Sequence, residues 1–107
     1  MIVRIWRGEA ANAEAARAYH EHFAHTVAHT LNGIAGHRGA QLLRREHDGK
    51  VEFLAVTLWE SMDSIRRFTG DNPDVAVVEP EARAVLSDFD AFARHYELAF
   101  ASDRRTA

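Results

Sequence analysis

The pattern of hydrophobic and polar positions is most distinctive from Val51 to Trp59, where successive side chains alternate between the two sides of a strand. Apart from Glu52, both sides of this alternation are largely apolar, and β-branched and aromatic residues recur in it. This pattern is typical of a strand buried on both faces at the centre of a sheet. Ser61 follows as a helix N-cap with Asp63 in the first turn, which predicts that the chain passes directly from this strand into a short helix.

The chain before this strand predicts one strand and one long helix. Residues 1–7 alternate as a strand, and Gly8 is expected to end it. Residues 11–31 carry apolar side chains at helical spacing, and Asn32 and Gly33 supply a stop.

The rest of the chain adds two more strands and a second short helix. Residues 40–46 predict a strand that Asp48-Gly49 joins to the central one as a hairpin. A short helix is expected near Pro80, and residues 87–100 alternate as the last strand. The order β-α-β-β-α-β predicts an α+β, ferredoxin-like fold with a four-stranded antiparallel sheet. We expect one domain over residues 1–98 and a polar C-terminal tail over 99–107.

Helices cover only one face of such a sheet. The other face of the central strand carries Leu54, Val56 and Leu58, which are too apolar to leave in water. Two such faces packed together in a symmetric pair would bury them. The sequence therefore predicts a homodimer through the sheet face.

Composition excludes several classes of protein. The 107 residues include no cysteine, which rules out a disulfide framework, a thiol nucleophile and a thiolate metal site. The formal charge is −3 with acids and bases interspersed, so no basic face for nucleic acid is expected. No apolar run approaches the roughly 20 residues that cross a membrane, and the N-terminus lacks signal-peptide features. A cytoplasmic location is the default expectation.

Histidines concentrate in the long helix, at positions 20, 22, 25 and 29. His22, His25 and His29 are spaced to share one side of the helix and to bind a transition metal. However, no HExxH motif and no evident carboxylate accompany them, so we expect no metal. One alternative is that they lie on a partly wet helix edge. Another is that His22 alone faces a pocket beside Tyr19, with Phe23 on the same apolar face.

Five segments together resemble the antibiotic biosynthesis monooxygenase family: MIVRIWRG, GHRGAQLLRR, VEFLAVTLWESMDSIRRF, AVVEPEAR and FDAFARHYE. The resemblance extends over about residues 1–98. It implies a dimeric α+β barrel whose pocket lies between the sheet and the helices of each subunit. It also implies that Trp59 lines this pocket, whereas composition alone favours a packing role for this side chain. The family includes quinone-forming monooxygenases and haem-degrading enzymes.

Two departures from these relatives bear on function. The quinone-forming members carry an asparagine where this chain has Ala55. The haem-degrading members use a histidine in the segment after the tryptophan, and residues 61–72 contain none. Haem binding or degradation is therefore the lesser expectation.

The expected chemistry is cofactor-independent oxygenation of a small aromatic or quinol-type substrate by dioxygen. His95, with His22 as the second candidate, would act as a base that makes an electron-rich carbanion. Arg4 or Arg44 would hold the resulting anion, and Trp59 would stack on the ring. Arg4 is alternatively a solvent-exposed charge at the sheet rim, and His95 alternatively makes a structural hydrogen bond. Two other possibilities remain open: a non-catalytic binding or sensing dimer, and a domain whose own side chains fill the pocket.

Overall fold

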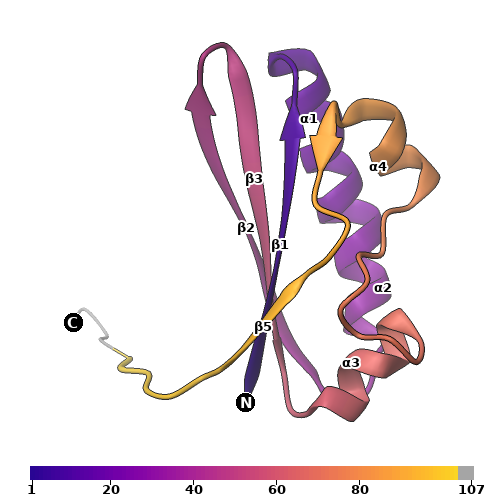
Figure 1. The fold of residues 1–107 in the computed structure, drawn as a ribbon, viewed down its shortest axis with the longest axis vertical. Helices are drawn as coiled ribbons and strands as arrows, with labels where there is room; N and C mark the ends of the chain where they lie inside the picture. Colours follow the sequence, from indigo (N-terminus) through magenta and orange to yellow (C-terminus); the bar gives the residue numbers. More distant parts are fainter. Residues whose placement is uncertain (104–107) are drawn as a thin grey trace.

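The computed structural model describes residues 1–103, and its centre is a twisted antiparallel sheet (Figure 1). The strand order is β2-β3-β1, and the two short strands β4 and β5 both pair with the outer edge of β1. The strands are β1 (Ile2–Ala10), β2 (His37–His47), β3 (Lys50–Trp59), β4 (Asp88–Phe89) and β5 (Arg94–Glu97). The predicted central strand is β3, and the α+β, ferredoxin-like fold is confirmed.

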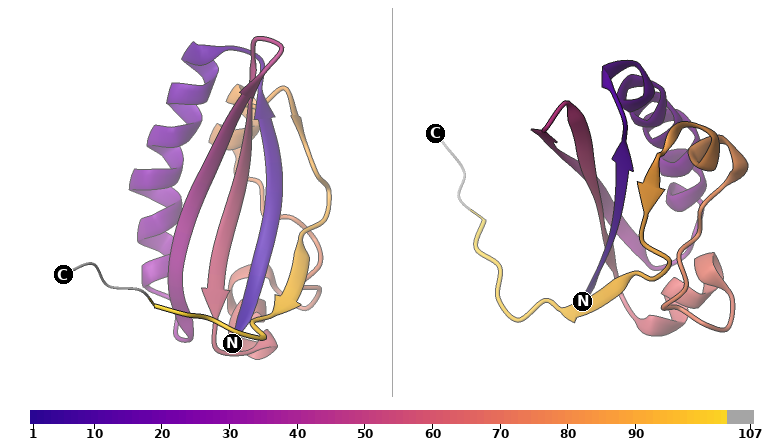
Figure 2. Two further views of the ribbon diagram at one scale, coloured as in Figure 1. Left: turned by 90° about the vertical axis from the view of Figure 1, so that its left-hand side faces the viewer. Right: turned by 45° about the horizontal axis from the view of Figure 1, so that its top comes forward.

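All the helices lie on one face of this sheet (Figures 1 and 2). They are α1 (Ala13–His22), the π-helical turn η1 (Phe23–Val27), α2 (Ala28–Asn32), α3 (Met62–Thr69) and α4 (Pro80–Val85). The long helix predicted for residues 11–31 is thus one continuous rod with a π turn in its middle. The expected stop at Gly33 is confirmed.

Side-chain caps fix where the helices begin. Asn12 Oδ1 accepts a hydrogen bond from the Ala15 amide at 2.9 Å, so α1 starts after Asn12. Ser61 and Ser64 form a reciprocal capping box at the start of α3, which confirms the predicted N-cap. Because β3 ends at Trp59, the strand and α3 meet at a tight corner.

The core lies between the sheet and the helices. Residues paired across β1 and β3 point to the same side of the sheet. Trp6 pairs with Ala55 and Gly8 pairs with Phe53, so Trp6 and Phe53 both point toward the helices. A larger cluster forms around them, and a smaller one forms around Trp59 at the other end of the rod. The smaller cluster consists of Leu31, Trp59 and Ile65.

Two expected strand boundaries are wrong. Gly8 does not end the first strand, which continues to Ala10. A Cβ at Gly8 would lie 3.0 Å from Leu86 Cδ1 and 3.1 Å from the Trp6 ring, so the glycine makes room inside the strand. The last strand is not continuous over 87–100: between β4 and β5, residues 91–93 bond to the 74–76 segment, with Ala76 N donating to the Ala91 carbonyl at 3.0 Å and Ala93 N to the Asp74 carbonyl at 2.8 Å. Trp6 Nε1 also donates to the Asp90 carbonyl at 2.7 Å.

The opposite face of the sheet carries no helix (Figure 2). Leu54, Val56 and Leu58 lie on it half-buried, and Leu43 and Tyr96 beside them are each 48% exposed. After β5 the chain runs away from the body of the molecule (Figure 1). Among residues 1–103, no helix is long and apolar enough to span a membrane.

Candidate functional site

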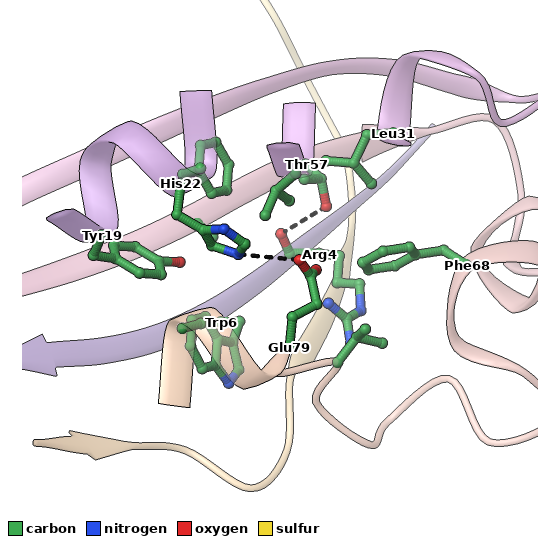
Figure 3. Close-up of a pocket in the computed structure, with 13 residues that line it drawn as sticks. Arg4, Trp6, Tyr19, His22, Leu31, Thr57, Phe68 and Glu79 are labelled. Carbon is green, nitrogen blue, oxygen red and sulfur yellow. Dashed lines mark hydrogen bonds and ion pairs between the residues drawn. The ribbon is translucent and has the colours of Figure 1, made fainter. Parts of the chain in front are cut away.

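A cavity opens between the helix-covered face of the sheet and the rod of α1, η1 and α2 (Figure 3). Its volume is about 40 Å³, enough for roughly three water molecules. Four sequence-predicted site residues line it: Arg4, Tyr19, His22 and Phe23. The other lining residues are Trp6, Val27, Leu31, Ala55, Thr57, Phe68, Val77, Glu79 and Ala82.

Arg4 is a buried cation in the wall of this cavity, not a charge at a wet rim. Its exposed fraction is 5%, and its Nη2 donates a hydrogen bond to the Val75 carbonyl at 3.0 Å. The guanidinium carbon lies 5.7 Å from the centre of the Phe68 ring. Burial lowers the pKa of Arg4 to about 10, and Asp74 partly offsets this. At neutral pH the cavity therefore contains a positive charge.

His22 faces the cavity beside Tyr19, as one of the sequence hypotheses proposed. Its side chain is 8% exposed, and its Nε2 lies 3.0 Å from Glu79 Oε2 (Figure 3). His22 ends α1, and η1 follows it directly with Phe23 and Val27 turned into the same cavity. Single π turns in α-helices often accompany functional sites. Burial, with Glu79 adding to it, raises the pKa of Tyr19, so its hydroxyl stays protonated.

Glu79 is a lining residue that the sequence pattern did not predict. Glu79 is the N-cap residue of α4, immediately before Pro80, and its side chain makes no capping bond. The sequence signal that could have pointed to Glu79 is an acidic residue directly before a proline that starts a helix. The carboxylate of such a residue can point away from the helix when it makes no capping bond. Thr57 and Phe68 were also missed, although both lie on the sides of β3 and α3 that face the helix-covered core.

The cluster of His22, His25 and His29 that the helical spacing allowed does not form. His25 and His29 are exposed, and His25 Nε2 pairs with Glu21 at 2.9 Å on the helix surface. A different set is close enough to hold a divalent cation: His22, Glu79 and Glu81 offer ligand atoms within 4.8 Å of one another. The absence of a bound metal stays a prediction.

Trp59 lies behind the cavity and not in its lining. Its exposed fraction is 0%, and it packs in the smaller core cluster. Its Nε1 donates a hydrogen bond to Thr57 Oγ1 at 2.8 Å, and its ring stacks on Phe68 with 6.0 Å between centres. Trp59 therefore supports two lining side chains, Thr57 and Phe68, from the rear.

His95 lies opposite Arg4 in the β1–β5 pairing, at the lip of a separate shallow depression. Its Nδ1 is 3.3 Å from Asp74 Oδ1, and its buried Nε2 has no hydrogen-bond partner among residues 1–103. Burial and the positive charge of Arg4 lower the pKa of His95, against the opposing effect of Asp74. Arg4 stands at the cavity wall, whereas His95 does not line it.

Arg44 lies outside this arrangement. It projects from β2, where it is exposed and pairs with Glu46 at 2.9 Å. It does not line the cavity. Of the two arginines predicted for the site, Arg4 lines the cavity and Arg44 does not.

The fold and the cavity define a small α+β domain with a cavity between sheet and helices. A family model described as antibiotic biosynthesis monooxygenase matches residues 1–86. The chain belongs to this family. No curated protein matches the sequence.

Solved structures show the same fold. The haem-degrader MhuD from Mycobacterium tuberculosis, solved with two haems in its active site, is 23% identical, with 96% of this chain and 100% of that one covered and a TM-score of 0.64. A protein from Deinococcus radiodurans described as a provisional antibiotic biosynthesis monooxygenase is 15% identical, with 99% and 100% covered and a TM-score of 0.66. A similarly described protein from Bacillus cereus is 10% identical, with 96% and 97% covered and a TM-score of 0.64.

The residues of this chain do not fit a haem. The segment after Trp59, residues 61–72, contains no histidine, and His22, which lines the cavity, faces Glu79. The cavity of about 40 Å³ has no room for a macrocycle, and Trp6 and Phe68 occupy its walls.

Proposed function

We propose that this protein is a cofactor-independent monooxygenase that oxidises a small aromatic or quinol-type substrate with dioxygen. The observation that carries the proposal is the pairing of a buried histidine with a carboxylate in an otherwise aromatic cavity. Such a pair suits general-base catalysis because a carboxylate beside the imidazole stabilises its protonated form; the contact at 3.0 Å is at ion-pair distance without the alignment of a hydrogen bond.

His22 is the proposed base and Glu79 its positioning residue. For an anthrone-type substrate, His22 takes a proton from the acidic C–H group, and Arg4 stabilises the charge that spreads to the ring oxygen. The carbanion transfers electrons to dioxygen and forms a C–O bond. One oxygen atom stays as the new carbonyl, and the other leaves as water with the two hydrogens of the oxidised carbon.

The walls of the cavity supply the aromatic binding surface. Trp6, Tyr19, Phe23 and Phe68 offer ring faces and edges to a planar ligand. Small-molecule sites commonly measure several hundred Å³, so a ring-sized ligand requires Phe68 or the segment before α4 to shift. Trp59 contributes through Phe68, which it stacks against.

We further propose that the protein works as a homodimer joined through the helix-free face of the sheet. Leu54, Val56 and Leu58 on β3, with Tyr96 on β5, form the apolar patch that such a dimer would bury. A cytoplasmic location and the lack of a nucleic-acid partner stay predictions of the sequence.

The test compares oxygen uptake with a panel of anthrones and hydroxynaphthoquinols for the wild type, His22→Gln and His95→Gln. Glutamine keeps a hydrogen-bonding side chain but cannot take up a proton at neutral pH. His22→Gln is expected to lower turnover by about 10²- to 10⁴-fold with substrate binding roughly kept. His25→Gln, on the exposed side of the same rod, is the matched control and should leave turnover unchanged.

Other outcomes assign the site differently. Loss of turnover in His95→Gln but not in His22→Gln would make His95 the base. Oxygen-independent binding without any turnover by the wild type would favour the alternative of a non-catalytic binding or sensing dimer. The small volume of the cavity instead favours the third possibility, a domain whose own side chains fill the pocket, for which neither binding nor turnover would be seen.

A further inference from the structure

Arg4 has no partner of opposite charge in direct contact. Within residues 1–103, no carboxylate oxygen lies within 4.0 Å of its guanidinium nitrogens. Asp74 acts on it from further away, is 67% exposed, and pairs with His95 instead. A buried cation without a contacting counter-ion is unusual, since buried charges are ordinarily paired.

The hydrogen bonding of Arg4 is also incomplete. Nη2 donates to the Val75 carbonyl, whereas the buried Nε has no partner among the described residues. An arginine offers five N–H donors in a planar fork that matches a carboxylate. Among residues 1–103, at least one buried donor of Arg4 therefore has no hydrogen-bond partner, and its charge has no contacting counter-ion.

The surroundings of Arg4 favour a carboxylate over a larger anion. The cavity volume of about 40 Å³ admits a group of carboxylate size without rearrangement. Thr57, which lines the same cavity, accepts a hydrogen bond from Trp59 Nε1 and donates its one hydrogen to the Arg4 carbonyl at 3.4 Å, so the donors for a ligand carboxylate come from Arg4. Phe68, which packs over the guanidinium, leads from this polar corner to the aromatic walls. A ring attached to the carboxylate would then extend toward Trp6 and Tyr19.

We infer that the cavity takes an aromatic carboxylic acid, whose ionised carboxylate pairs with Arg4 before any chemistry occurs. This rests on the proposed function in that both use the same cavity. The inference goes beyond the proposed function because the negative charge is a permanent part of the ligand, and not only a charge that forms during oxidation. A neutral quinol would leave Arg4 buried and unpaired, and would bind more weakly for that reason.

The test is anaerobic calorimetric titration with two probes of nearly equal shape, 1-hydroxy-2-naphthoate and 1-hydroxy-2-naphthamide. The wild type is expected to bind the carboxylate at least ten-fold more tightly than the amide. Arg4→Gln should reduce this preference to less than three-fold. Arg17→Gln removes the same charge from the exposed surface of α1 and should leave the preference as it is in the wild type.

Three results would overturn the inference: equal affinity of the wild type for both probes, an undiminished preference in Arg4→Gln, or no binding of either probe. If Arg4→Gln does not fold, NMR of the wild type tests the same contact. The Arg4 Nε–H signal should shift and become protected from solvent exchange with the naphthoate but not with the amide, and no difference between them would sink the idea. Oxygen uptake is a separate measurement, so failure of catalysis and failure of carboxylate recognition are distinguishable.

Discussion

At the scale of single residues, the unusual group is Arg4, a charge that the fold keeps out of water without a contacting counter-ion. The lowering of its pKa from 12.5 to about 10 corresponds to a penalty on the charged form of the order of 3 kcal/mol. A structural role alone does not account for such a penalty. Binding residues, by contrast, are often retained at the expense of stability.

Arg4→Met should therefore stabilise the folded protein by roughly 1–3 kcal/mol, because an apolar side chain of similar length removes the buried charge. The lost hydrogen bond to Val75 offsets only part of this gain. Urea unfolding of the wild type and of Arg4→Met measures the difference. A loss of more than about 1 kcal/mol would show that Arg4 holds the fold together.

His95 should make stability depend on pH. Burial is the main cause that lowers the pKa of His95 in the folded state, and the positive charge of Arg4 adds to it. The unfolded state therefore binds the proton more tightly. The free energy of unfolding should consequently fall as the pH drops through the unfolded value of about 6.5. His95→Gln should make this fall shallower between pH 7.5 and 5.5. The remaining slope would include His37, whose pKa is also lowered by burial; an unchanged slope would contradict the assignment.

The sequence predicted some of the residues that line the cavity, and the reasons are local. Helical spacing was enough to put Tyr19, His22 and Phe23 on one face of the rod. Spacing could not show which way Glu79 turns, because that depends on α4 packing against α1. It also could not distinguish a ring that lines a cavity from one that lies a layer behind it, and Trp59 is of the second kind.

At the scale of elements, patterns predicted the strands and helices well except where packing overrides them. The 87–100 segment alternates throughout, yet residues 91–93 bond to the 74–76 segment between β4 and β5, so the strand is not continuous. Gly8 would be expected to break a strand, but here it serves a close approach of Trp6 and Leu86. Both exceptions come from contacts across the sequence, which no local pattern records.

The corner where β2 begins beside α3 depends on a glycine. Gly36 has φ +92°, and a Cβ on it would lie 2.4 Å from Ser64 Cβ. Gly36→Ala should destabilise the protein by more than about 2 kcal/mol, because backbone strain and a steric clash add. Gly49→Ala is the matched control: its φ is +77° with nothing within 4 Å, so about 1 kcal/mol is expected. Thermal or urea unfolding compares the two, and equal losses would show that the clash is absorbed.

At the scale of the whole molecule, the asymmetry between the two faces of the sheet is the main feature. Helices cover one face and form the cavity there, while the other face carries half-buried leucine and valine side chains. At about 25 cal/mol per Å² of apolar surface, burying a patch of a few hundred Å² favours association by several kcal/mol before ordering costs. The fold therefore leaves a driving force for assembly that a single chain does not use.

The final prediction tests that driving force. The wild type should sediment at about twice 12.0 kDa at micromolar concentration, and Val56→Lys should give monomer or aggregate because it places a charge in the centre of the apolar patch. Ala18→Lys puts the same charge on the exposed surface of α1 and should sediment as the wild type does. If the wild type sediments as a well-folded monomer, the sheet face is not a dimer interface. If only Val56→Lys dissociates, the interface includes β3, and oxygen uptake by that monomer would then show whether the cavity needs the second subunit.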